Sequence, residues 1–255
     1  FFVGWSESSG EELWVSDGSP EGTQFVMDIM PGAGSSLIIG ITPFGTGVMF
    51  SANDGATGNE PWFSDGTAAG TLRLADIHQD DIIQTGPSQF TTLGSSSLFV
   101  AWSTVHGPSL WATDGTPAGT RLVKDIVPGN DGAHLSILGK AGPYVYLRAE
   151  DFVHGKELWR SDGTTEGTVM VTEHTAGPYT LGGDTWFPTV HAIGSRLWYA
   201  TGPDYTAFIS DGSPGAANPA VPASTQPTAG SSTCDGTSRA VGRLVYFVAR
   251  APLLG

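Results

Sequence analysis

Short apolar stretches alternate along the whole chain with clusters of Gly, Pro, Ser and Asp. Near the middle of the chain, four such stretches of four to seven residues follow one another, at 90–93, 98–102, 109–113 and 120–126. Apolar stretches of this length that end in turn-forming residues are typical of β-strands. We therefore expect an all-β chain in which no helix is longer than about two turns.

The same pattern recurs through the sequence together with one phrase. The phrase occurs as ELWVSDGSPEGT at 12–23, EPWFSDGTAAGT at 60–71, SLWATDGTPAGT at 109–120 and ELWRSDGTTEGT at 157–168, with a degenerate copy, AFISDGSPG, at 207–215. The aromatic residues that anchor the copies are 48, 49, 48 and 49 residues apart, and they are Trp14, Trp62, Trp111, Trp159 and Phe208. Each anchoring Trp is expected to pack between neighbouring repeats.

Four short strands in a repeat of about 49 residues match one blade of a β-propeller. The sequence thus predicts a five-bladed β-propeller of four-stranded blades that forms a single domain over residues 1–255. An open solenoid of stacked β-units is the alternative. The ring is favoured because it leaves only short, protected strand edges.

An Asp-Gly pair follows each anchor, at 17–18, 65–66, 114–115, 162–163 and 211–212. The Asp carboxylate can accept a hydrogen bond from the backbone about two residues further on, and the Gly can adopt a positive φ. Each pair is therefore expected to form a hairpin turn. Calcium binding is the alternative, but a calcium ion takes about six to eight oxygen ligands and each turn offers one carboxylate. No cofactor is predicted.

The longer phrase ELWxSDGTxxGTxLVKDIxPG, seen almost whole over 110–129, resembles the ELWxxDGT repeat family of bacterial exported and surface proteins. The resemblance covers nearly the whole chain. It implies a propeller-like repeat and a secreted or cell-surface location, and it implies no particular activity. The fifth copy departs from the family's pattern, with Phe208 in place of Trp, Ala216 in place of Thr, and Pro219 in its fourth strand, where a missing donor suits an edge.

Composition and charge narrow the classes of partner. The chain has 255 residues, of which 39% are hydrophobic, so it can bury a substantial core. Its net charge of −14 repels phosphate backbones and anionic membranes, which excludes nucleic acid as a partner. No apolar run approaches the roughly 20 residues that span a bilayer, and the single cysteine, Cys234, permits no internal disulfide.

Variation within the repeated frame indicates where a ligand could bind. In the second strand of each repeat a small residue recurs, and the residue after it changes from copy to copy. The changing residues are Trp5, Asn53, Trp102, Glu150 and Thr201, and the loops that follow them add Asp54, His106, Asp151, His154 and Tyr205. We interpret these ten residues as a candidate ligand-binding rim. Trp5 and Trp102 would be stacking platforms there, and the alternative is that both indoles are buried against the next blade.

Other chemistry at these positions is less favoured. His106 and His154 occupy equivalent places on adjacent blades, where one metal ion would be too distant to bind both, so we expect solvent-exposed loop histidines. Glu12, Glu60 and Glu157 are expected to pair with charges on neighbouring strands. No GxSxG, HExxH or P-loop motif is present.

The leading hypothesis is a non-enzymatic, lectin-like module that binds a glycan, because aromatic side chains beside Asn, Asp and Glu suit carbohydrate recognition. A scaffold for adhesion or for binding a cell-surface protein is the alternative. A glycoside-active enzyme, with Asp54, Glu150 and Asp151 converging on one pocket, is less favoured because near-identical blades argue against a single catalytic pocket.

The termini suggest how the ring would close. The segment 244–249 repeats the role of a second strand, as residues 1–4 do. Either the two ends overlap or this segment opens a further blade, and we expect 236–249 to pair with the N-terminal blade, since such pairing protects both edges.

Overall fold

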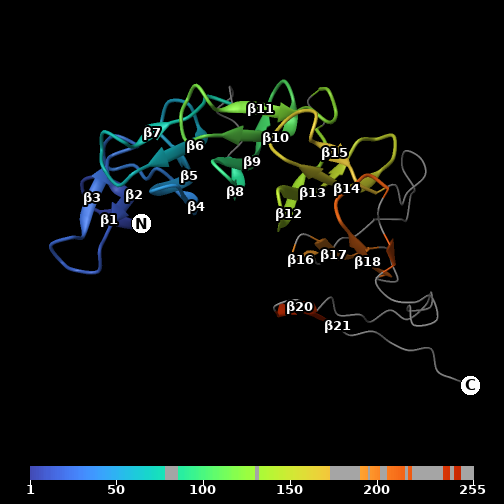
Figure 1. The fold of residues 1–255 in the computed structure, drawn as a ribbon. Coiled ribbons are helices and arrows are strands. Elements are labelled where there is room, and N and C mark those ends of the chain that lie inside the picture. The colour runs from blue at the N-terminus through green and yellow to red at the C-terminus, as the bar shows by residue number, and fades with distance from the viewer. Residues whose placement is uncertain are drawn as a thin grey trace, which may run out of the picture. The chain divides into compact units, whose positions relative to one another are not determined.

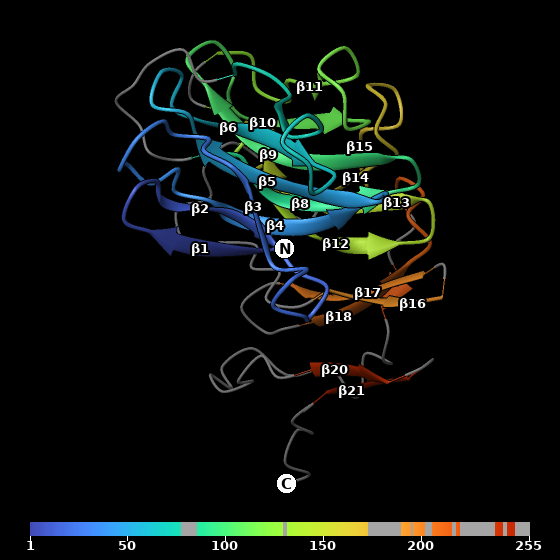
Figure 2. The ribbon, with the colours of Figure 1, turned by 90° about the vertical axis from the view of Figure 1, so that its left-hand side faces the viewer.

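A computed structural model describes residues 1–77, 86–129, 132–172, 190–194, 196–201, 206–215, 218–219, 238–241 and 244–247. These residues form 21 β-strands and no helix, which confirms the all-β prediction (Figures 1 and 2). The chain divides into two compact units, Phe1–Gly132 and Ala133–Gly255. Within the described residues, no helix has the length and hydropathy to cross a membrane.

The first unit contains three antiparallel sheets in which strands adjacent in sequence are adjacent in space. The first sheet is β1 (Phe2–Ser6), β2 (Gly10–Val15) and β3 (Gln24–Met27). The second is β4 (Ile39–Phe44), β5 (Gly47–Asn53), β6 (Asn59–Ser64) and β7 (Leu72–Arg73). The third is β8 (Ser88–Leu93), β9 (Ser96–Ser103), β10 (Gly107–Thr113) and β11 (Arg121–Lys124), close to the strands expected from the sequence.

The second unit continues the same order. Its first sheet is β12 (Ser136–Ala141), β13 (Tyr144–Glu150), β14 (Lys156–Ser161) and β15 (Val169–Met170). The next is β16 (Val190–Ile193), β17 (Arg196–Thr201), β18 (Thr206–Ser210) and β19 (Asn218–Pro219), with the strand that contains Pro219 at the edge, as predicted. A two-stranded sheet follows, made of β20 (Ser238–Val241) and β21 (Leu244–Phe247).

The five predicted blades are therefore present as five antiparallel sheets of three or four strands. The first sheet has three strands because β1 takes the place of a second strand: it pairs with β2 as β5 pairs with β6. By the same comparison, β20 and β21 take the first and second places of a further repeat. Ring closure, by pairing of 236–249 with the N-terminal sheet, stays a prediction.

The core lies between neighbouring sheets within each unit. In the first unit, Leu13 of the first sheet packs in one cluster with Phe50 and Trp62 of the second sheet. A second cluster joins Met49 of the second sheet to Phe99 of the third. Trp62 is only 5% exposed, which confirms for this residue that the anchoring Trp packs between repeats. In the second unit, Tyr146 and Leu158 pack in the same way with Leu197 and Tyr199 of the following sheet.

The Asp-Gly pairs form the predicted turns. In the second repeat, Asp65 Oδ1 accepts hydrogen bonds from the backbone N–H of Thr67 at 2.9 Å and from its hydroxyl at 2.7 Å. The Ser64 hydroxyl accepts from Gly66 N–H at 3.1 Å, and the Thr67 hydroxyl accepts from Gly70 N–H at 3.0 Å. The turn glycines have φ between 88° and 95° in all five repeats. These contacts account for every fixed polar residue of the SDGT phrase by local structure alone.

Candidate functional site

The residues that vary between repeats lie at one end of each sheet, which we call the crossover end. It comprises the end of the second strand, the hairpin to the third strand, and the segment that crosses over into the next sheet. In the first unit, Glu11 accepts a backbone hydrogen bond from Ser36 at 3.1 Å, and the Ser36 carbonyl accepts from Asn53 N–H at 2.8 Å. The crossover is therefore fixed to the hairpin ends of two consecutive sheets, and candidate residues on these loops are held in place.

Buried glutamates anchor these crossovers, and for Glu12 this corrects the expectation of pairing with a strand charge. The side chains of Glu12, Glu60 and Glu157 are all fully buried. The Glu12 carboxylate accepts hydrogen bonds from the backbone N–H groups of Ile29 at 3.1 Å and Met30 at 3.2 Å. Burial raises the pKa of Glu12 above its ordinary value, although the hydrogen bonds it accepts act in the opposite direction.

The same anchor recurs in two further repeats. Glu60 accepts from the backbone N–H of Ile77 at 2.9 Å, and Glu157 accepts from the Thr172 hydroxyl at 2.6 Å. A fully buried carboxylate needs such donors because it has lost its hydration. Each glutamate therefore binds a residue 15 to 18 positions further along the chain, through the backbone for Glu12 and Glu60 and through a side-chain hydroxyl for Glu157.

The third repeat is held in another way, because Ser109 replaces the glutamate. His106 Nδ1 lies 2.8 Å from Asp125 Oδ2 and donates to it, and the Ser109 hydroxyl donates to the His106 carbonyl at 2.9 Å. The side chain of His106 is 33% exposed. This histidine is thus partly buried and bonded within its own repeat, contrary to the expectation of a free loop histidine.

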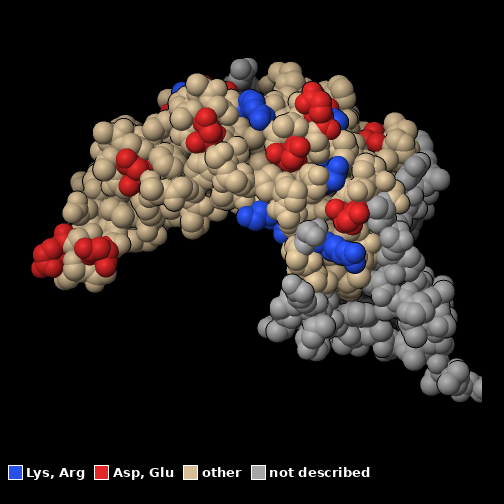
Figure 3. Space-filling model, viewed as in Figure 1, with Lys and Arg blue, Asp and Glu red and all other residues tan. Residues whose placement is uncertain are grey.

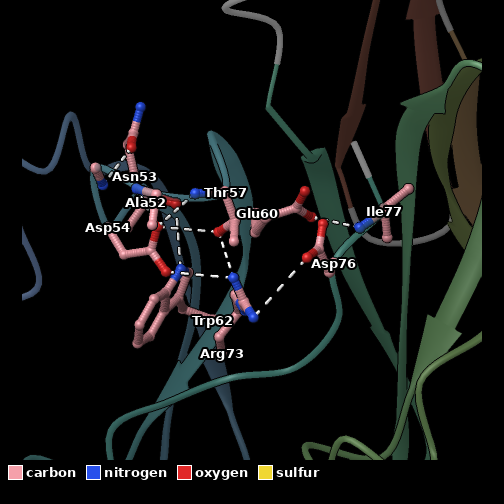
Figure 4. A network of polar contacts seen from close by, with 11 residues as sticks. Ala52, Asn53, Asp54, Thr57, Glu60, Trp62, Arg73, Asp76 and Ile77 are labelled. Atoms are coloured by element: carbon pink, nitrogen blue, oxygen red, sulfur yellow. Dashed lines mark hydrogen bonds and ion pairs between the residues drawn. The ribbon is translucent and has the colours of Figure 1, made fainter. Parts of the chain in front are cut away.

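Asn53 and Asp54 shape the hairpin of the second repeat (Figure 4). Asp54 Oδ1 accepts from the Thr57 backbone at 2.8 Å and from its hydroxyl at 3.0 Å, and Asp54 Oδ2 lies 3.3 Å from Arg73 Nη1. Arg73 also donates to the Thr57 hydroxyl and lies 4.0 Å from Asp76. Burial alone would raise the pKa of Asp54, but its hydrogen bonds and the Arg73 charge outweigh burial and lower it.

The fourth repeat carries two further pairs of acid and imidazole. Asp151 accepts from His154 Nδ1 at 2.6 Å and from the His154 backbone N–H at 2.7 Å. Burial would raise the pKa of Asp151, but these bonds lower it below its ordinary value. Glu150 accepts from Nδ1 of His134 at 3.1 Å. His134 is a residue that the sequence did not single out.

The two candidate tryptophans differ in exposure. Trp5 is 69% exposed at the end of β1, opposite Glu11 in the strand register, so the alternative that its indole is buried is wrong. Trp102 stands at the equivalent place in β9, opposite Pro108, and is half-buried. Trp5 therefore offers the larger free aromatic surface.

The structure brings only some candidates together. Asp54 and His106 lie in the first unit, Glu150, Asp151 and His154 in the second, and each polar side chain is engaged within its own repeat. Thr201 ends β17, where its backbone pairs with Thr206, and Tyr205 lies outside the described residues. Among described residues, no group of three or more His, Cys, Asp or Glu side chains is placed to hold a metal ion.

The crossover ends also expose apolar side chains that the sequence reasoning missed. Leu37 is 47% exposed, Val105 60% and Val153 62%. Val105 and Val153 each lie in a hairpin that also contains a candidate histidine, so the sequence did offer a signal for these two residues. Nothing in the strand pattern distinguished Leu37 from a residue of the core.

Charged side chains of both signs are scattered over the described surface in Figure 3. On the face drawn in Figure 3, the few Lys and Arg side chains are interspersed with Asp and Glu and with uncharged surface. Together with a net charge of −14, this leaves phosphate no continuous positive surface on that face.

No protein-family model and no curated protein matches the chain. Solved structures with β-propeller domains are similar to it at low identity. A puromycin hydrolase matches with a TM-score of 0.44 and 16% identity over 98% of this chain and 42% of that one. TolB from Acinetobacter baumannii matches with a TM-score of 0.42 and 16% identity over 88% and 50%. The tricorn protease matches with a TM-score of 0.38 and 10% identity over 82% and 20%. The chain thus spans half or less of the length of these proteins.

Proposed function

We propose that the chain is a non-enzymatic binding module that recognises carbohydrate at the crossover ends of its sheets. The observation that carries this proposal is the 69% exposure of Trp5. A large aromatic side chain so exposed gains little from folding, and its flat apolar face suits the C–H face of a sugar ring. The equivalent places in other repeats hold Asn53, Trp102 and Glu150, so the frame itself does not require an indole.

Polar groups beside Trp5 support the same function. Glu11 stands directly opposite Trp5 in the register, and its side chain is exposed. Its backbone N–H is bonded to Ser35 Oγ at 3.0 Å, which holds the crossover close by. A carboxylate and a hydroxyl next to an exposed indole offer hydrogen-bond partners for sugar hydroxyls. A catalytic role is not proposed, because Asp54, Glu150 and Asp151 are each engaged in structural hydrogen bonds or ion pairs.

A protein-binding scaffold is the second candidate. This candidate is favoured by three residues that expose apolar surface on the loops of the crossover ends, Leu37, Val105 and Val153. Exposed apolar side chains on loops that are rigidly anchored are a feature of protein interfaces. Both candidates agree with the resemblance to exported ELWxxDGT repeat proteins, which we propose as the chain's family and which implies a secreted or cell-surface location.

The two candidates are separated by binding measurements on one pair of variants. Wild type and Trp5→Ala are applied to a glycan array, with Phe25→Ala as the matched control. Phe25 is 42% exposed in the same sheet, and the register places it on the opposite face from Trp5. We expect glycan binding by wild type and Phe25→Ala and its loss in Trp5→Ala. Binding to no glycan, together with capture of a cell-surface protein, would replace the carbohydrate proposal by the scaffold.

A further inference from the structure

At its crossover end the fourth repeat has two aromatic rings, those of His134 and Phe152, at places where the second repeat has other residues. The two repeats correspond through one hydrogen bond: Glu150 N–H donates to Ala133 at 2.7 Å, as Asn53 N–H donates to Ser36 at 2.8 Å. By this correspondence His134 takes the place of Leu37. Phe152, two residues after Glu150, takes the place of Gly55.

Both rings are held in an unfavourable backbone conformation. His134 has a φ of 42°, as Leu37 at the equivalent place has a φ of 51°, whereas Phe152 has a φ of 59° where the second repeat has a glycine with a φ of 78°. Residues with a side chain rarely adopt this left-handed region, and a glycine adopts it freely. The strain specific to this repeat is therefore that of Phe152, and strain of this kind concentrates at binding sites, where the side chain is needed at that place.

The two rings and one carboxylate form a compact group. The imidazole of His134 and the ring of Phe152 meet edge to face, with centroids 6.1 Å apart and an interplanar angle of 80°. Glu150 Oε2 accepts from His134 Nδ1 at 3.1 Å, and the side chain of His134 is 61% exposed. Because Nδ1 is engaged by Glu150, Nε2 is the nitrogen of this exposed ring that can form a hydrogen bond with a ligand.

The two carboxylates of this hairpin are each hydrogen-bonded to an imidazole of the same repeat. Glu150 is bonded to His134 and stands opposite Lys156 in the register, and Asp151 is bonded to His154. Both carboxylates are therefore already engaged as hydrogen-bond acceptors. The group offers an aromatic edge, an exposed imidazole and a carboxylate oxygen, which match a neutral ligand with hydroxyl groups and a C–H face.

We infer that His134, Phe152 and Glu150 form a subsite for a neutral saccharide in the fourth repeat. This inference rests on the proposed carbohydrate function and extends it to residues outside the variable strand position. The imidazole supplies the stacking surface and a hydrogen-bonding nitrogen at Nε2, Phe152 packs edge to face against the imidazole, and Glu150 fixes its orientation.

The substitution Phe152→Gly tests the subsite without harming the fold. It removes the ring and relieves the strain of the left-handed backbone, so the thermal midpoint of unfolding should rise. The affinity for a neutral oligosaccharide should fall about tenfold, which corresponds to the loss of one aromatic contact. His134→Ala should lower affinity to a similar extent. Leu37→Ala, at the equivalent place in the second repeat, is the matched control and should retain full affinity.

The probe is an array of neutral gluco-, manno- and galacto-oligosaccharides, with the imidazole resonances of His134 followed by NMR during titration.

The outcomes separate this inference from the proposed function. Loss of binding in Phe152→Gly and His134→Ala, with a shift of the His134 resonances in wild type, supports the subsite. Full binding by Phe152→Gly overturns it, even if Trp5→Ala abolishes binding and the carbohydrate function stands. Loss of binding in Phe152→Gly but not in Trp5→Ala supports the subsite and removes Trp5 from the proposed site. Binding of no neutral glycan by wild type overturns the subsite as well.

Discussion

At the scale of the residue, the repeated phrase is a set of local hydrogen bonds. The Asp carboxylate, the hydroxyls on either side of it and the following glycines close the turn among themselves. Hydrogen bonds to Asp65 lower its pKa, and the same holds for Asp17 and Asp114. Because these side chains are already engaged, the most regular residues of the sequence are the least available to a ligand.

The second glycine of the phrase is expected to be intolerant of a side chain. A Cβ at Gly70 would lie 2.1 Å from Asp65 Oδ1, too close for both atoms. Gly70→Ala should therefore lower the free energy of unfolding by about 1–3 kcal/mol, the range for overpacking. Urea denaturation measures the loss, and Ala69→Gly, next to it in the same turn, is the control. Equal stability of Gly70→Ala and wild type would contradict the tight turn.

Glu12 should make the stability of the protein depend on pH in the opposite direction to the aspartates of the turns. Its pKa is raised in the folded state, so its contribution to stability is present below the unfolded value of 4.5 and is lost as pH rises through the folded value. The stability of wild type relative to Glu12→Gln should therefore increase as pH falls from 7 towards 4.5. Unfolding midpoints of both proteins over this range give the difference. A difference that is constant or decreases on acidification would show that the carboxyl is not destabilised by burial.

The two indoles of the variable position should differ in their effect on stability. Trp5→Ala should change the free energy of unfolding by no more than about 0.5 kcal/mol, because the side chain is largely exposed. The loss in the free energy of unfolding caused by Trp102→Ala should be intermediate, because Trp102 is half-buried. It should lie between about 1 kcal/mol, expected of a free platform, and about 3–5 kcal/mol, expected of a core residue. A loss at the upper end of that range would place Trp102 in the core and remove it from the candidate site.

At the scale of the element, each sheet depends on the one packed against it. Phe99 of β9 is fully buried in the cluster that joins the second and third sheets, where it lies 5.2 Å from the ring of Phe90. Phe99→Ala should cost about 3–5 kcal/mol in the free energy of unfolding. Val105→Ala in the same repeat is the control, since Val105 is 60% exposed and should cost little. Equal losses would mean that the two sheets do not share this core.

At the scale of the whole molecule, closure is the prediction that remains from the sequence. Phe2 is 40% exposed on the first sheet, whereas Phe50 and Phe99, paired in the same way with their anchoring Trp, are fully buried. Covering this face would bury apolar surface, which is the physical gain that closure offers. Deleting 236–255 should therefore lower the thermal midpoint sharply. An unchanged midpoint would contradict closure.

The sequence by itself determined the all-β class, the repeat, the strands of each sheet and the Asp-Gly turns. These follow from alternation of apolar residues and from hydrogen bonds between residues two to seven positions apart, such as Asp65 with Thr67 and Ser64 with Thr71. Interactions of such short range are specified by neighbours in the chain, so a single copy of the phrase already implies its own turn.

Only the tertiary structure decided what the candidate residues do. Glu12 reaches Ile29, Glu60 reaches Ile77 and His106 reaches Asp125, partners 17 to 19 residues away that no periodicity indicates. The exposure of Trp5 and the left-handed backbone of His134 depend on where a crossover packs, which the strand pattern leaves open. A site at the ends of sheets is built from such crossovers, because the sheet fixes the register of its strands but not the loops that join one sheet to the next.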